Sequence, residues 1–261
     1  MAHLKSFLAL VRVRHTAQVV GIVSVLSLKS NGFSVQSFFT IASFLFLSVA
    51  LFSCDDAHDY VSDSLIHPER PIPKGVFTPN QVYLIGAISF SLGILFAANL
   101  MFYQFILFLS VAVLGFSVIF LKLGSILRAI FISSMIFILF PMGMIISLKS
   151  ILFGLIVALP HFAGSVTKDF IHLKGDEKIG LQPPLDWSRY LAGFAFFMSG
   201  GIILLPVILN LVTWLYMPLV FPTFVSCLIL GGKVLSRQYQ KVYIYGGIGM
   251  ISALVAFATN I

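Results

Sequence analysis

Long apolar runs separated by short polar segments organise the whole chain. A helix of about 20 apolar residues is long enough to cross the hydrocarbon core of a membrane, and the sequence supplies such runs from end to end. The runs are apolar at successive positions, and not at every second position as in the strands of a membrane barrel. The pattern predicts an all-α, polytopic membrane protein with about nine transmembrane helices.

The predicted helices share an almost unbroken apolar composition, and most of their connections are short, apart from residues 55–81 and 167–189. We expect them at residues 7–28, 38–54, 82–101, 105–121, 129–148, 151–166, 190–208, 211–230 and 242–261. Arg12, Arg14 and His15 interrupt the first of them. We expect a single transmembrane domain over residues 1–261.

Composition and charge agree with a membrane location. The chain is 59% hydrophobic and 10% charged, against roughly 45–50% and 25% in soluble proteins, which excludes a soluble protein. With a cytoplasmic N-terminus, 14 of the 16 Lys and Arg residues fall in cytoplasmic segments, and only Lys29 and Lys149 fall opposite. Basic residues concentrate on the cytoplasmic side of membrane proteins, so this asymmetry explains the net charge of +7 and no nucleic-acid partner is expected.

The acidic residues are confined to two segments, both on the predicted cytoplasmic side. The first holds five and the second four of the nine acids, namely Asp55, Asp56, Asp59, Asp63 and Glu69, then Asp169, Asp176, Glu177 and Asp186. Acids at the membrane edge are expensive and are functional candidates by default. The two segments are therefore where we expect the chemistry.

Three acids of the first segment form a regular series. Asp55, Asp59 and Asp63 recur every four residues, which places them on one helical face. Like charges at this spacing repel, and Mg²⁺ takes carboxylate oxygens together with phosphate oxygens. The series therefore indicates a site for metal and phosphate, with a solvated charged helix end as the alternative.

The acidic segments resemble the two motifs of the UbiA family of membrane prenyltransferases. DDAHDYVSD at 55–63 resembles the first motif, NDxxDxxxD, and ERPIPKG at 69–75 resembles the RPxPxG turn that follows it. KDFIHLKGDEKIG at 168–180 resembles the second motif, KDxxDxxGD. Both fall in the expected connections of a nine-helix chain, so the resemblance extends over nearly the whole sequence and implies a UbiA-type bundle.

Two positions depart from the family pattern. Asp55 stands where the first motif has Asn, and His172 stands where the second has Asp. Imidazole is a poorer partner than carboxylate for Mg²⁺, and Asp169, about one helical turn before His172, is the alternative ligand. The exchange leaves the number of carboxylates in the two motifs unchanged.

The resemblance implies a Mg²⁺-dependent prenyltransferase, a transferase of alkyl groups other than methyl. Its donor is a polyprenyl diphosphate held by Mg²⁺ at the two motifs. The implied metal ligands are Asp55, Asp59, Asp63, Asp169, His172 and Asp176, among which Asp59, Asp63 and Asp176 are the implied catalytic residues. Candidates to bind the diphosphate are Arg70, Lys168, Lys122, Arg12 and Arg14, although the last three are equally well explained as charges that orient the chain.

Other roles and functions stay open at the level of the sequence. Asp56 is expected to orient ligands or to cap the helix. The expected acceptor is a membrane-associated archaeal glycerophosphate lipid, as for digeranylgeranylglyceryl phosphate synthases, or an aromatic quinone precursor. The alternatives are a catalytically diverged, isoprenoid-binding member of the family and, from a different class, an ion-coupled transporter.

Overall fold

The computed structural model describes residues 2–176, 184–239 and 242–261, without the side chains of residues 2–4, 66, 172–176 and 243. Throughout this part of the chain the regular structure is helical, with no strand. Seven of the described helical segments are long and apolar enough to cross a membrane, and a shorter apolar helix covers Ile244–Ala258. The all-α prediction is confirmed, and the chain is an integral membrane protein.

Contacts between helices divide the chain into two compact units, Met1–Lys122 and Leu123–Ile261. Unit 1 contains α1 (Ala2–Leu10), α2 (Val13–Asn31), α3 (Val35–His58), α4 (Tyr60–Ile66), α5 (Pro79–Ala97) and α6 (Phe102–Phe120). Unit 2 contains α7 (Ser125–Gly143), α8 (Leu148–Asp176), α9 (Ser188–Ile202), α10 (Leu205–Ile208), α11 (Tyr216–Leu235) and α12 (Val242–Ala258).

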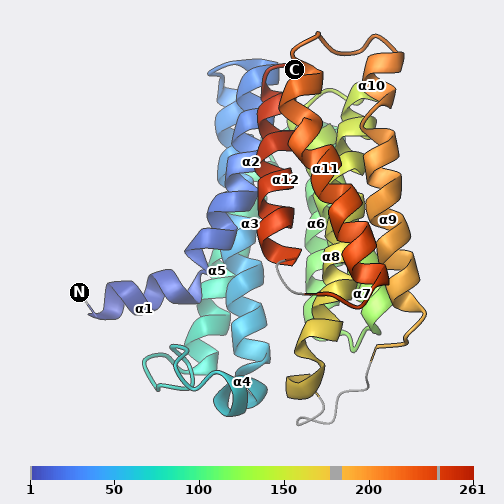
Figure 1. Ribbon diagram of the computed structural model, residues 1–261. Helices are drawn as coiled ribbons and strands as arrows, with labels where there is room; N and C mark the ends of the chain where they lie inside the picture. The colour runs from blue at the N-terminus through green and yellow to red at the C-terminus, as the bar shows by residue number, and fades with distance from the viewer. Residues whose placement is uncertain (1, 177–183, 240–241) are drawn as a thin grey trace. The chain divides into compact units, whose positions relative to one another are not determined.

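The first predicted span is broken in the structure. Helix α1 ends at Leu10 and α2 begins at Val13, and Arg12 between them has left-handed backbone angles, φ 43° and ψ 54°. Figure 1 shows α1, in dark blue, turning away from the other helices of unit 1. The predicted interruption by Arg12 is thus a change of chain direction, and neither α1 nor α2 is a candidate span.

In unit 1, α3 is the central helix and packs against α2, α5 and α6. Ser34 caps its start by accepting a hydrogen bond from the Ser37 amide, 3.2 Å. Gly86 of α5 lies so close to α3 that an added Cβ would stand 2.7 Å from Cys54 Sγ. Small residues permit such close approach between membrane helices, and this contact lies directly beside the first acidic motif.

The chain after α4 forms a tight turn before α5 begins. Gly75 has φ +72°, in the left-handed region that glycine adopts readily. Thr78 and Gln81 then form a capping box, each side chain bonding the other's backbone amide, with Pro79 in the first helical turn. Ile72 of the turn is buried in an apolar cluster with Leu10, Ala57 and Val82, which ties the turn to α1, α3 and α5.

In unit 2, α8 packs against α7, α9 and α12. Its apolar core near the second motif includes Ala129 of α7, Ala163 and Val166 of α8, Phe196 of α9 and Val234 of α11. Partly buried Phe170 stacks on Tyr239 with ring centroids 5.4 Å apart. The core therefore fixes α8 up to the turn in which Asp169 lies.

Candidate active site

The first acidic series continues along an almost unbroken helical path from α3 into α4. The backbone amide of Asp59 donates to the Asp55 carbonyl at 3.0 Å, and that of Asp63 donates to the Asp59 carbonyl at 2.8 Å. These bonds keep the spacing of one helical turn across the short break at Asp59. The three carboxylates therefore rise along one side of the helix, as their spacing predicts.

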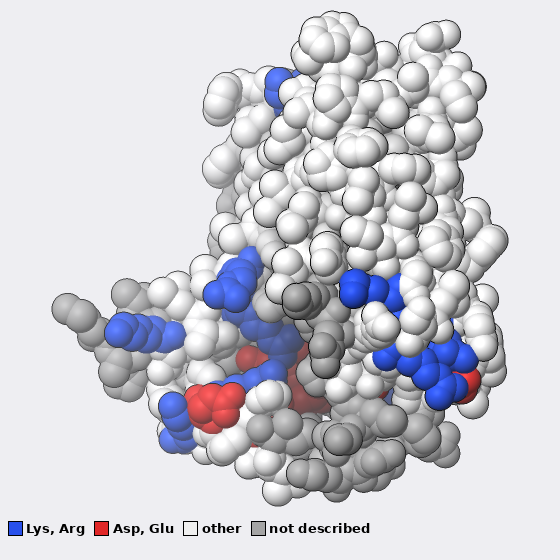
Figure 2. Space-filling view, viewed as in Figure 1, with Lys and Arg blue, Asp and Glu red and all other residues white. Residues whose placement is uncertain are grey.

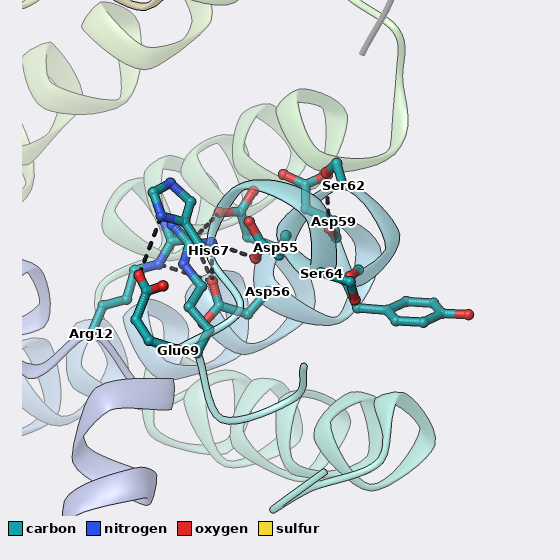
Figure 3. Close-up of polar contacts among 11 residues, drawn as sticks. Arg12, Asp55, Asp56, Asp59, Ser62, Ser64, His67 and Glu69 are labelled. Atoms are coloured by element: carbon teal, nitrogen blue, oxygen red, sulfur yellow. Dashed lines mark hydrogen bonds and ion pairs between the residues drawn. The ribbon is translucent and has the colours of Figure 1, made fainter. Parts of the chain in front are cut away.

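Two arginines from distant parts of unit 1 contact these acids. Arg12 Nη2 lies 2.8 Å from Asp55 Oδ2, and its Nε donates to Asp56 Oδ1 at 3.0 Å. Arg70, from the turn after α4, donates to Asp63 and lies 3.6 Å from Asp56 Oδ1. Figure 3 shows Arg12 and the two neighbouring carboxylates of Asp55 and Asp56 pointing toward one another.

The middle acid of the series differs from its neighbours. Asp59 is exposed, and no described cationic side chain forms an ion pair with it. Partial desolvation and the carboxylates of Asp55 and Asp63 raise the pKa of Asp59 above its usual value. A carboxylate crowded by like charges is stabilised by a nearby cation. Asp59 is therefore the carboxylate of this series that a bound cation would stabilise most.

These carboxylates suit a magnesium ion that is shared with a phosphate. Among the described residues, no three acidic, histidine or cysteine side chains converge closely enough to hold a metal by themselves. Mg²⁺ commonly takes only one or two carboxylates and completes its octahedral shell with water and substrate phosphate. Asp55, Asp59 and Asp63 fit that requirement, and the guanidinium groups of Arg12 and Arg70 beside them are of the kind that can donate to phosphate oxygens.

The second motif is partly described, in unit 2. Asp169 is 8% exposed and accepts hydrogen bonds from Ser125 and Arg128, both in the first turns of α7. The sequence analysis named Asp169 as a metal ligand and did not single out Ser125 or Arg128. No local pattern could have paired them, because 41 residues separate Arg128 from Asp169.

The remaining predicted site residues whose side chains are described have no ion pair with a described carboxylate. Arg14, Lys122 and Lys168 are exposed side chains. The side chains of His172 and Asp176, in the last turn of α8, lie outside the described part of the structure. Asp186, in the segment before α9, is ion-paired with Arg237 at 3.1 Å and with Arg189 at 3.4 Å.

The face seen in Figure 2 shows broad areas without charged side chains, and the red carboxylates next to blue Lys and Arg. Large uncharged surfaces suit helices that face lipid. The charged side chains on this face lie beside partners of opposite charge and form the polar part of its surface.

Comparison with solved structures shows the fold. A structure described as digeranylgeranylglyceryl phosphate synthase matches with a TM-score of 0.83 and 22% identity, over 100% of this chain and 99% of that one. A UbiA homologue from Archaeoglobus fulgidus, bound to DMAPP and Mg²⁺, matches with a TM-score of 0.67 and 14% identity, over 97% and 98%. A structure of a UbiA homologue from Archaeoglobus fulgidus bound to GPP and Mg²⁺ matches with a TM-score of 0.61 and 13% identity, over 97% of this chain and 99% of that one.

A sequence comparison with curated proteins finds no match. The model of the UbiA prenyltransferase family, in contrast, matches residues 19–256, which is most of the chain and includes both acidic motifs. The chain therefore belongs to the UbiA prenyltransferase family.

Proposed function

We propose that this prenyltransferase moves a polyprenyl group from an isoprenoid diphosphate to a membrane-associated acceptor, in a reaction that needs Mg²⁺. The observation that carries the proposal is the exposed Asp59 between Asp55 and Asp63, with Arg12 and Arg70 beside them. Carboxylates for a hard cation and arginines for phosphate oxygens form the combination that a diphosphate–magnesium complex requires. The solved homologue with DMAPP and Mg²⁺ supports the same pairing of ligands.

In the proposed reaction the bond between the prenyl carbon and the diphosphate oxygen breaks, and its electron pair leaves with the diphosphate. Arg12 and Arg70 bind the leaving diphosphate and stabilise the negative charge that develops on it. Asp55, Asp59 and Asp63 would hold Mg²⁺, which when bound would supply further stabilisation of that charge. The acceptor forms the new bond to the prenyl carbon and loses a proton.

Both acidic motifs contribute to the proposed reaction, within one functional domain of residues 1–261. Asp55, Asp59 and Asp63 of the first motif are the proposed metal ligands in unit 1. In the second motif Asp176, with His172 or Asp169, is proposed to fill that role. Asp169 is bonded to Ser125 and Arg128, much as Asp55 is paired with Arg12, so we keep both His172 and Asp169 as proposed partners of Asp176.

For the acceptor, we propose the hydroxyl group of a glycerophosphate lipid. The digeranylgeranylglyceryl phosphate synthase structure supports this choice, since it matches essentially all of both chains. The RPIP and KGD sequences of the two acidic loops support it as well, because these loops resemble the RPIPxG and KDxxDxxGD motifs of digeranylgeranylglyceryl phosphate synthases. An aromatic quinone precursor is the alternative acceptor.

Diphosphate release by the detergent-purified protein tests the proposal. Geranylgeranyl diphosphate is supplied with and without Mg²⁺, and with either geranylgeranylglyceryl phosphate or hydroxybenzoate as the acceptor. We expect release that needs Mg²⁺ and that the glycerophosphate lipid stimulates. Stimulation by hydroxybenzoate alone would transfer the assignment to quinone precursors, whereas no release with any combination would contradict the proposed reaction and favour a diverged, isoprenoid-binding protein.

A further inference from the structure

Asp56 differs from the three acids of the series although it lies among them in the sequence. It is 4% exposed; among the three, Asp63 is also buried, at 7%, while Asp59 is exposed. Successive residues on a helix point in directions about 100° apart, so Asp56 cannot share the face of Asp55, Asp59 and Asp63. A buried carboxylate is costly unless cations or hydrogen-bond donors surround it.

The partners of Asp56 are the two proposed diphosphate-binding arginines. Arg12 Nε donates to Asp56 Oδ1 at 3.0 Å, and Arg70 Nη1 lies 3.6 Å from the same oxygen. These arginines come from the α1–α2 junction and from the turn after α4, 44 residues before and 14 residues after Asp56. One buried oxygen therefore faces two guanidinium groups from separate parts of unit 1.

Each arginine also contacts one acid of the series Asp55, Asp59 and Asp63. Arg12 pairs with Asp55 at 2.8 Å, and Arg70 pairs with Asp63. An ionised carboxylate offers about four lone-pair sites on its two oxygens, and a metal ion on Asp55 and Asp63 would take up part of the capacity that the arginines now use. Asp56 is then the carboxylate that keeps both guanidinium groups in place.

The geometry points to a positioning role for Asp56, which rests on the proposed function: we propose that Asp56 holds Arg12 and Arg70 beside the diphosphate site while Asp55 and Asp63 bind metal. A guanidinium group has five N–H donors and stays charged, so it can donate to Asp56 and to a phosphate at once. The left-handed backbone of Arg12, unusual for a non-glycine residue, is consistent with a residue whose side chain must reach a fixed partner.

Binding of a diphosphate that cannot react tests this role apart from turnover. The probe is a thiodiphosphate analogue of geranylgeranyl diphosphate with Mg²⁺, and calorimetry on the purified full chain measures its affinity. We expect Asp56→Asn to weaken binding about tenfold or more, as loss of a residue that supports a ligand-binding residue commonly does. We expect Asp186→Asn, which removes an Asp–Arg contact outside this cluster, to bind like the wild type.

A mutant cycle, in which Asp56→Asn is measured alone and in a variant that lacks both arginines, separates positioning from a general loss of structure. If Asp56 acts through the arginines, adding Asp56→Asn to the Arg12→Gln, Arg70→Gln variant causes little further loss, because interacting residues give non-additive effects. Full additivity would overturn the proposal. If Asp56→Asn does not fold, Arg12→Lys keeps the charge but not the paired geometry, and wild-type affinity in that variant would overturn the proposal equally.

Binding of Mn²⁺ alone, measured by electron paramagnetic resonance, distinguishes a positioning residue from a metal ligand. We expect Asp56→Asn to keep its Mn²⁺ affinity and Asp59→Asn to lose it. Equal losses in both variants would make Asp56 a metal ligand and refute the positioning role. A wild-type protein that binds Mn²⁺ but not the analogue would refute the proposed function itself, and the role of Asp56 with it.

Discussion

The exposed carboxylate of Asp59, flanked by Asp55 and Asp63, carries the first prediction at the residue scale. Asp59→Ala and, in the second motif, Asp176→Ala should abolish prenyl transfer, because each removes a proposed metal ligand. A loss of about 10²-fold or more is expected for groups that stabilise developing charge. Diphosphate release measures the effect, with membrane insertion as the control, and full activity in either variant would refute the site assignment.

The raised pKa of Asp59 predicts a pH dependence for metal binding. Mg²⁺ requires the ionised carboxylate, so protons compete with the metal and affinity should fall as the pH is lowered toward that pKa. In the metal-free protein, stability changes with pH in the opposite direction. Because the pKa of Asp59 is raised in the folded state, that state binds the proton more tightly than the unfolded state, and the contribution of Asp59 to stability is lost as the pH rises. Mn²⁺ titrations of the wild type at several pH values measure the first effect, and thermal unfolding of the metal-free wild type and of Asp59→Asn measures the second. An unchanged pH dependence of stability in the variant would assign that dependence to another group.

Asp169 provides a residue-scale prediction about stability. Its carboxylate is buried and accepts from both Ser125 and Arg128, so Asp169→Asn should lower the stability by about 1–3 kcal/mol. Asp186→Asn is the matched control, since exposed ion pairs contribute about 0–1 kcal/mol. Thermal unfolding in detergent measures both variants. Equal, small shifts would indicate that the Asp169 contacts contribute no more than a surface pair.

At the scale of the helices, the close contact of α3 with α5 positions the first motif. A Cβ on Gly86 would stand 2.7 Å from Cys54 Sγ and 3.4 Å from the Ala50 carbonyl oxygen. Gly86→Ala should therefore lower the stability by about 1–3 kcal/mol, the usual cost of overpacking, and disturb Asp55 next to Cys54. Thermal unfolding and Mn²⁺ affinity measure the two effects.

Two further variants make the Gly86 experiment specific. Gly246→Ala, in α12, adds a methyl group where no other group lies within 4 Å, so it should not be destabilising. Combining Gly86→Ala with Cys54→Ala removes the sulfur atom and should restore much of the lost stability. If the double variant is no more stable than Gly86→Ala, the sulfur contact is not the cause.

At the scale of the whole molecule, the proposed orientation in the membrane can be tested by chemical labelling. Leu65, after the acidic series, is 75% exposed, and Phe33, between α2 and α3, is 99% exposed. The native Cys54 and Cys227 are buried, so they are poor targets for a membrane-impermeant maleimide. With cytoplasmic motifs, Leu65→Cys should react only from the cytoplasmic side and Phe33→Cys only from the opposite side. The reverse pattern would contradict the orientation inferred from the basic residues.

The sequence by itself determined the fold class and the type of chemistry. Apolar runs of membrane-spanning length predict helices because the hydrocarbon core leaves backbone groups no partner outside the helix. Acids confined to two segments indicate a functional site because carboxylates at a membrane edge are too costly to lie there without a role. The spacing of Asp55, Asp59 and Asp63 indicates that the site binds metal and phosphate. These inferences depend only on local composition and spacing, and the family match over residues 19–256 agrees with them.

Only the tertiary structure decided which charges meet. The break at Arg12, the approach of Arg70 to Asp63 and the burial of Asp56 between both arginines arise from packing among α1, α3, α5 and the turn before α5. Arg128 likewise finds Asp169 across 41 residues. Such partners are chosen by the three-dimensional arrangement of helices, and no periodicity or spacing along the chain encodes them.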